Sequence, residues 1–244
     1  RIRRLFSCDQ RTRLSVIALT KGLNPNAPMK DSGIEWLGEV PEHWVIRKMT
    51  HLFRAFKGRN SQMLTKEYLS ENAGDYPVYS GQTENNGVMG GWSEYEFDAG
   101  DEGVLFSTTV GAKAMTLNHL RGKFSLSQNC MIIKPVKVAG FVRFFYYHLQ
   151  PLFAFERSLI PDHMQASFRM EDLYGYQVAV PGENEQAAIA LAIDSYTQAS
   201  DSLASEAVRA ITLLQERRSA LISAAVTGQI DVRGFSAGGG SEAA

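Results

Sequence analysis

The longest regular pattern of hydrophobic positions lies near the end of the chain. From Glu183 to Thr227 the sequence contains neither Gly nor Pro, and Gly182 and Gly228 flank this segment as natural helix stops. The pattern therefore predicts one long helix over 183–230. In a heptad frame, nine of eleven seam positions are apolar, and we expect the pairing contacts from Ile189, Ile193, Tyr196, Leu203, Ala207, Leu214 and Leu221.

The length of this helix indicates where its partner lies. At about 1.5 Å per residue, a helix over 186–226 reaches roughly 60 Å, which exceeds the diameter of a small domain. Most of it should project, and the segment 1–21 is too short and too rich in Arg to cover the seam. We expect it to pair with a helix of another polypeptide or of a missing half. The alternative is a helix that folds back over its own domain.

Between Trp44 and Pro181 the pattern changes to short apolar runs separated by Gly, Asn and Ser. These runs predict strands at 76–79, 104–107, 130–134 and 177–180, and the aromatic run 141–155 favours a helix. The fold class is therefore α+β, a mixed α/β globule followed by one long helix. The expected divisions are a residual helix end and linker over 1–28, a globular domain over 29–182, the long helix over 183–230 and a flexible tail over 231–244.

Composition bounds the class of protein. With 44% apolar and 10% aromatic residues in 244, the chain can bury a hydrophobic core. Cys8 and Cys130 lie far apart, so they indicate neither a disulfide framework nor a structural zinc site, and a cytoplasmic location fits this usage. There is no apolar run of membrane-spanning length and no signal-peptide pattern, which argues against membrane insertion and secretion.

The distribution of charge is uneven. The net charge of -1 argues against a nucleic-acid binder, because neutralising phosphates is the main source of affinity for DNA. However, residues 67–102 hold nine Asp or Glu and no Lys or Arg, whereas residues 108–169 hold eight Lys or Arg and two acids. One surface can thus be basic while the total is neutral. The alternative is an ordinary scatter of solvated charges.

Catalytic motifs are missing from the sequence. It has no Walker loop, no His-Glu-x-x-His and no Asn/Asp-Pro-Pro-Tyr. The acids Asp98, Asp101 and Glu102 fit a solvated turn better than an active site. We therefore expect no catalytic residue and no bound metal.

Two strings at the edges of the chain resemble a known family. Met29–Trp44 (MKDSGIEWLGEVPEHW) is similar to the segment that opens each target-recognition domain of type I restriction-modification specificity subunits. Glu183–Gln186 and Leu214–Gly228 resemble the entry and exit of the family's conserved spacer helix. Tyr76–Gly87 and Ser127–Cys130 resemble one subgroup of its recognition domains. The residues 29–182 are thus expected to form a target-recognition domain.

The resemblance implies a function without catalysis. It implies a specificity subunit that binds double-stranded DNA, reads one half of a bipartite target, and docks methyltransferase (modification) subunits and restriction/translocation subunits. This chain would bind no cofactor, and S-adenosylmethionine, ATP and Mg would serve those partners. The family's full subunits resemble two such units in series, with the two helices packed side by side, and the resemblance therefore implies an antiparallel coiled coil for the long helix. Either two copies form a homodimer, or this is the carboxy-terminal half of a longer protein. Residues 13–24 loosely repeat the sequence of 218–231, and this echo favours the second alternative. The rival interpretation is a coiled-coil assembly protein that binds protein.

Candidate DNA contacts are polar side chains on predicted loops, because specific binding needs both phosphate and base-edge contacts. The stretch 157–169 is the strongest candidate for base reading. At 85–87 and at 108–113, turn formation is an alternative explanation of the residues present. Core packing is the better interpretation of Trp36, Trp44, Trp92 and the run 144–147. The complete set is Lys57, Arg59 and Asn60 after a predicted helix, then Gln82, Asn85, Asn86, Thr108, Thr109, Lys113, Arg157, His163, Gln165 and Arg169.

Overall fold

The computed structural model of the protein describes residues 17–82, 84–111, 113–136, 142–161 and 163–230. The chain divides into two units, which within the described residues are a globular unit of 17–194 and a helical unit of 195–230. The predicted tail 231–244, residues 1–16 of the predicted linker 1–28 and residues 13–16 of the echo 13–24 lie outside the described residues.

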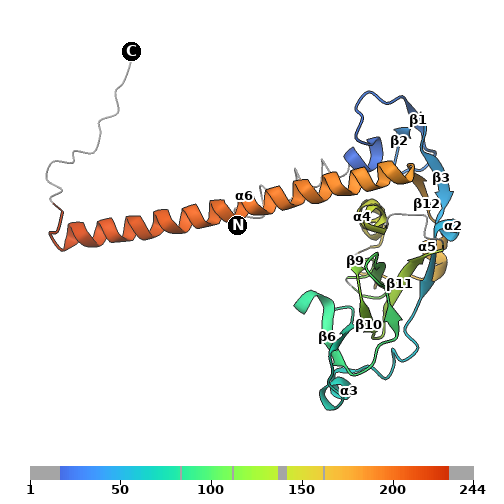
Figure 1. Cartoon of the computed structure of the whole chain (residues 1–244), viewed down its shortest axis with the longest axis horizontal. Helices are drawn as coiled ribbons and strands as arrows, with labels where there is room; N and C mark the ends of the chain where they lie inside the picture. The colour runs from blue at the N-terminus through green and yellow to red at the C-terminus, as the bar shows by residue number, and fades with distance from the viewer. Residues whose placement is uncertain (1–16, 83, 112, 137–141, 162, 231–244) are drawn as a thin grey trace. The chain divides into compact units, whose positions relative to one another are not determined.

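Short strands form the sheets of the globular unit (Figure 1). Within the described residues two sheets have four strands, in the orders β6-β5-β10-β7 and β4-β11-β8-β9, and two have two strands, β1-β2 and β12-β3. Neighbouring strands are antiparallel, except that β10 runs parallel to β5. The bounds are β1 (Met29–Asp31), β2 (Glu39–Pro41), β3 (Val45–Lys48), β4 (Phe53–Phe56), β5 (Tyr76–Tyr79), β6 (Val88–Trp92), β7 (Phe97–Asp98), β8 (Val104–Thr108), β9 (Leu117–Leu120), β10 (Lys123–Leu126), β11 (Cys130–Pro135) and β12 (Gln177–Val180).

The four predicted strands are confirmed as β5, β8, β11 and β12. Strand β8 is buried at every residue because it lies between two neighbours, with Leu105 opposite Ile133 of β11 and His119 of β9. A continuous apolar run is what a strand buried on both faces requires. This central strand leads directly into the loop that separates the two clefts described below.

The helices are α2 (Met49–Leu52), α3 (Lys66–Glu71), the short 3-10 turn η1 (Glu84–Gly87), α4 (Val142–Ser158), α5 (Met170–Gly175) and α6 (Glu183–Val226). The predicted aromatic helix is confirmed as α4. It packs against β8 and β9, and its buried residues Val142, Phe145, Leu149 and Leu152 recur at helical spacing.

The aromatic side chains fill the core. Trp44 and Phe144 are fully buried, and Phe145 and Trp92 are almost so. Trp36 packs against the same core while partly exposed. The structure thus agrees with core packing as the main role of these rings.

The first turns of α6 belong to the globular unit. Ile189 and Ile193 are 0% and 5% exposed and lie in its main hydrophobic core. The prediction that these two residues pair with a partner helix is therefore corrected. A heptad pattern records only that a position is apolar, and here the covering surface is the protein's own core.

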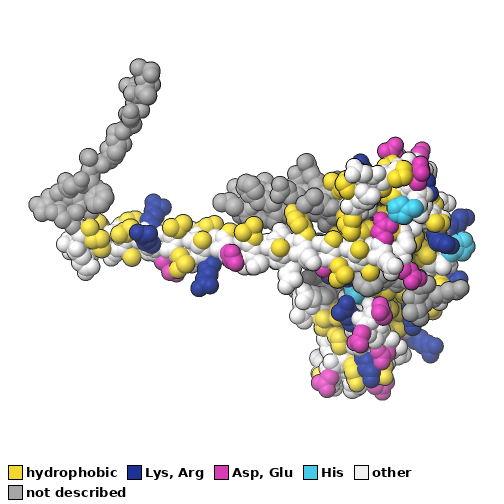
Figure 2. Space-filling model, turned by 45° about the horizontal axis from the view of Figure 1, so that its top comes forward, with side chains coloured by type: hydrophobic (Ala, Val, Ile, Leu, Met, Phe, Trp, Pro, Cys, Tyr) yellow, Lys and Arg dark blue, Asp and Glu magenta, His cyan; other side chains and the backbone are white. Residues whose placement is uncertain are grey.

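The helical unit presents the remaining apolar positions to solvent. Leu203, Leu214 and Leu221 are 69%, 64% and 49% exposed, Ala207 is exposed and Tyr196 is half-buried. Figure 2 shows hydrophobic side chains along much of the length of α6. A second row of exposed apolar side chains lies beside the heptad seam, at Val208, Ile211 and Ile222. The apolar face is thus wider than a two-helix seam requires.

Candidate nucleic-acid interface

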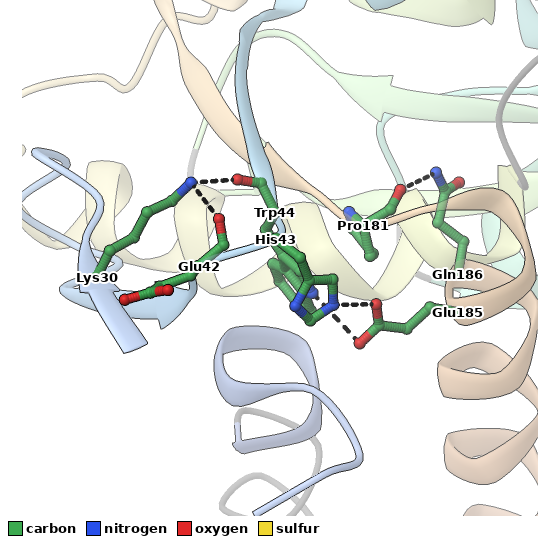
Figure 3. A network of polar contacts seen from close by, with 7 residues as sticks. All are labelled: Lys30, Glu42, His43, Trp44, Pro181, Glu185 and Gln186. Atoms are coloured by element: carbon green, nitrogen blue, oxygen red, sulfur yellow. Dashed lines mark hydrogen bonds and ion pairs between the residues drawn. The ribbon is translucent and has the colours of Figure 1, made fainter. Parts of the chain in front are cut away.

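The segment Met29–Trp44 meets the start of α6 in a polar joint (Figure 3). His43 Nε2 lies 2.7 Å from Glu185 Oε2, and the indole Nε1 of Trp44 donates to Glu185 Oε1 at 3.3 Å. Gly22, at φ +71°, lies so close that a Cβ there would be 2.9 Å from Glu185 Oε1. One carboxylate therefore ties the first turn of the long helix to the globular unit.

Further hydrogen bonds complete this joint. Lys30 Nζ donates to the backbone carbonyls of Glu42 and Trp44, at 2.7 and 2.6 Å. Gln186 Nε2 donates to the carbonyl of Pro181 at 2.9 Å. His43 and Glu185 are 142 residues apart in sequence and lie in one structural element. The hydrogen bonds between the two strings are a physical reason for the polar residues in both.

The loop between β8 and β9, residues 109–116, is held on two sides. The amide of Thr109 donates to Asn129 at 2.8 Å, and the amide of Phe168 donates to the Thr109 carbonyl at 2.7 Å. Met115 is buried in the left-handed region at φ 63°, a conformation that is costly for a side chain of this kind. The loop is therefore a constrained feature, and a cleft lies on each side of it.

The first cleft has a volume of about 430 Å³. Its walls come from the β5–β6 connection, the β8–β9 loop, strand β9 and helix α4. Four predicted DNA contacts, Gln82, Asn86, Thr108 and Lys113, line it together. Residues that the sequence prediction did not include complete the lining, among them Asn118, His119, Arg143 and Tyr146.

A fixed ion pair forms the α4 wall of the first cleft. Arg143 Nη2 lies 2.6 Å from Asp194 Oδ1, and Tyr147 also donates to this carboxylate. The hydrogen bond to Asp194 raises the pKa of Arg143. Burial works to raise the pKa of Asp194, but the bonds from Arg143 and Tyr147 outweigh it and lower that pKa. The guanidinium also lies 5.1 Å from the centre of the Tyr146 ring, so this wall is rigid and its charge is paired.

His119 is an uncharged member of the same cleft. Burial lowers the pKa of its imidazole, and the backbone hydrogen bond to Glu102 offsets this only in part. Its Nε2 lies 2.8 Å from the carbonyl oxygen of Glu102, so this nitrogen carries the proton of the neutral ring and donates. The histidine therefore braces β9 and adds no positive charge to the cleft.

The second cleft, of about 370 Å³, lies on the other side of the β8–β9 loop. It joins three predicted contacts, Lys57, Thr109 and Arg169, with Asn129, which the prediction named only within the string Ser127–Cys130. Two cationic side chains from segments more than 100 residues apart thus line one hollow. This is the arrangement that a phosphate backbone attracts.

Thr108 and Thr109 serve the loop itself. Both are buried, at 3% and 4% exposure. The hydroxyl of Thr108 donates to the carbonyl of Lys113 and accepts from the amide of Thr116 at 3.3 Å. The structure favours the turn-forming interpretation of these two residues.

The β5–β6 connection is also a turn. Asn85 and Asn86 have φ of 49° and 53°, and Gly87 follows at 83°. Asn85 Nδ2 donates to the carbonyl of Val88 at 3.4 Å. Asparagine and glycine are the residues that tolerate this backbone, so local geometry accounts for the Asn-Asn-Gly string.

The cluster Lys57–Asn60 follows strand β4 directly, and the helix predicted before it is only the short α2, which ends at Leu52. Phe53 and Ala55 are buried while Arg54 and Phe56 are exposed, the alternation typical of a strand, and β4 pairs with β11. The predicted contacts outside both clefts are Arg59, Asn60, Asn85, Arg157, His163 and Gln165.

No three His, Cys, Asp or Glu side chains within the described residues form a group that can hold a metal. Cys130 is buried, and burial raises the pKa of its thiol to about 12. None of the described helices combines the length and hydropathy needed to cross a membrane.

The mixed sheets, the long helix and the paired clefts define a binding protein, and comparison with known proteins gives its family. Residues 41–209, more than half of the chain, match the type I restriction modification DNA specificity domain. The chain belongs to this family, whose general role is recognition of DNA sequence. The specificity subunit of the type I restriction enzyme MpnII from Mycoplasma pneumoniae is 34% identical over 76 residues, which are 31% of this chain and 22% of that subunit.

Solved structures share the fold. The S subunit of a type I restriction-modification system from M. genitalium aligns with a TM-score of 0.54 at 20% identity, over 75% of this chain and 42% of its own. The HsdS subunit from Thermoanaerobacter tengcongensis aligns with 0.56 at 16% identity, over 83% and 47%. The chain spans less than a third of the length of several curated relatives and about half of these solved chains.

Proposed function

We propose that this protein is a non-catalytic DNA-binding subunit of a type I restriction-modification system and reads one half of a bipartite target. The observation that carries the proposal is the convergence of Lys57, Arg169 and Lys113 on two clefts beside one constrained loop. The chain has a net charge of only -1, so it has no general excess of cations. The grouping of these three side chains is therefore a property of the fold. In this proposal the lysines bind phosphates and fix the register, and Arg169 reads a base edge.

The exposed apolar face of α6 supports the second part of the proposal. Leu203, Leu214 and Leu221 pair antiparallel with an equivalent helix, from a second copy or from the other half of a longer subunit. The second row, at Val208, Ile211 and Ile222, and the segment 29–44 receive the modification and restriction subunits. Those partners supply S-adenosylmethionine, ATP and Mg chemistry.

A salt titration tests DNA binding directly. The full chain should bind random duplex DNA with an affinity that falls steeply as salt rises, since each phosphate contact contributes about 0.9 to the slope of log affinity against log salt. An assembly protein that binds only other proteins would have no such affinity to lose.

Two lysine variants locate the interface. Lys57→Ala combined with Lys113→Ala removes one cation from each cleft and should lower the salt slope by about 2. Lys66→Ala, on α3 and outside both clefts, is the matched control and should keep the slope of the unmodified chain. Equal slopes in all three proteins would place the DNA elsewhere.

A further inference from the structure

Several polar side chains of the first cleft are already bonded within the fold. Arg143 is held by Asp194, and Gln82 Nε2 donates to the carbonyl of Val88 at 2.7 Å. His119 donates to a backbone carbonyl. These groups shape the cleft, and each is held by at least one bond within the fold.

Two side-chain amides in the cleft remain without a hydrogen bond among the described residues, Asn86 and Asn118. Asn86 occupies a left-handed position before Gly87, and the turn alone explains its identity. Asn118 is different, because it lies within strand β9, where asparagine is disfavoured.

The surroundings of Asn118 make this placement informative. It lies opposite Phe106 of β8, whose side chain is buried, and it is half-buried itself. The amide of Asn118 is not one of the buried polar atoms that lack a partner within the described part of the chain, so it is accessible from the cleft. An apolar residue would suit the packing of this strand better. The strand also fixes the position of the amide more firmly than a loop can.

We propose that Asn118 is a specificity-determining residue and that its amide reads adenine. A carboxamide donates and accepts side by side, which matches the N7 acceptor and the N6 donor of adenine. Lys113, on the rim of the same cleft, neutralises a phosphate of the strand being read. This inference rests on the proposed DNA-binding function and names what one part of that site recognises.

The test is selection of bound sequences from a random duplex DNA library by the full chain. The unmodified protein should enrich a motif that contains an adenine with a preference of roughly 10- to 100-fold over other bases. Asn118→Ala should lose the preference at that position alone. Asn118→Asp, which has the same shape but only accepts, should shift the preference toward cytosine, whose N4 donates. Gln150→Ala, an exposed amide on α4 outside the cleft, is the control and should keep the motif.

The outcomes separate the two proposals. If the unmodified chain enriches no motif, the proposed DNA-binding function fails. If it enriches a motif and both Asn118 variants enrich the same one, Asn118 is not a reader and the present inference is overturned. Loss of enrichment at every position by both variants, with thermal unfolding unchanged, overturns it as well, because the side chain would then act on the whole interface.

Discussion

His148 on α4 makes the stability of the folded protein depend on pH. Its side chain is fully buried, stacks on Phe144 with ring centres 5.0 Å apart, and has Trp36 and Trp44 edge-on at 5.9 and 6.4 Å. Burial lowers the pKa of the imidazole from its ordinary 6.5 to about 4. The backbone of Leu19 offsets only part of this shift, since neither ring nitrogen has a well-formed hydrogen bond among the described residues. The folded protein therefore accommodates the neutral ring.

The lowered pKa predicts a protein that loses stability in mild acid. Above pH 6.5 the ring is neutral in both states. As the pH falls from 6.5 toward 4, the unfolded chain binds a proton that the folded protein does not, so the free energy of unfolding decreases. The full decrease in the free energy of unfolding is about 3 kcal/mol, of which about 2 kcal/mol is lost between about pH 7.5 and about pH 5.

Urea denaturation followed by tryptophan fluorescence measures this loss, because Trp36 and Trp44 lie against His148. The variant His148→Leu carries the same carboxylates but no titrating ring. The difference in free energy of unfolding between the two proteins should change by about 2 kcal/mol across this pH range. Parallel pH profiles would refute the reasoning. So would an NMR titration in which this imidazole protonates near pH 6.5 in the folded protein.

Three other predictions follow from the helix, the joint and the second cleft. Leu203→Asp with Leu214→Asp places carboxylates on the exposed apolar face of α6, and sedimentation should show that self-association is lost. Glu185→Ala removes the acceptor shared by two side chains of the segment 29–44 and should lower the free energy of unfolding in urea by about 1 kcal/mol. Arg169→Ala should weaken specific binding more than random-sequence binding, by about 1–3 kcal/mol in a competition assay.

Each of these predictions has a control. Ser205→Asp with Ser219→Asp adds the same charge to the opposite side of α6 and should leave association intact. Glu185→Gln keeps a carbonyl acceptor and should retain part of the stability. Equal losses on both DNAs for Arg169→Ala would reassign that side chain to a phosphate.

The regular elements were predictable because their signals are local. The stretch without Gly or Pro at 183–227 gave the long helix, and the apolar run at 104–107 gave the central strand β8. The pairing role of Ile189 and Ile193 was wrong because an apolar spacing does not identify the surface that covers it. In this case the covering surface is the core of the globular unit.

The clefts were predictable only in part because segments distant in sequence form them. Lys113 and Gln82 were found as polar residues beside glycines, but nothing local indicates that they share a cleft with Arg143. The sequence did hold two weaker signals. Arg143 is the only charged residue in the aromatic run 141–155, and Asn118 interrupts the apolar residues of a short strand.

The polar joint and the two clefts draw on different stretches of the chain. The joint uses residues 22–44 and 181–186, whereas the cleft linings fall within 57–171. A substitution in the cleft linings thus leaves the hydrogen bonds of the joint unchanged, although Arg143 in the wall of the first cleft is also bonded to Asp194 of α6. The attachment of the long helix and the lining of the clefts can therefore be changed by substitutions in separate stretches of the chain.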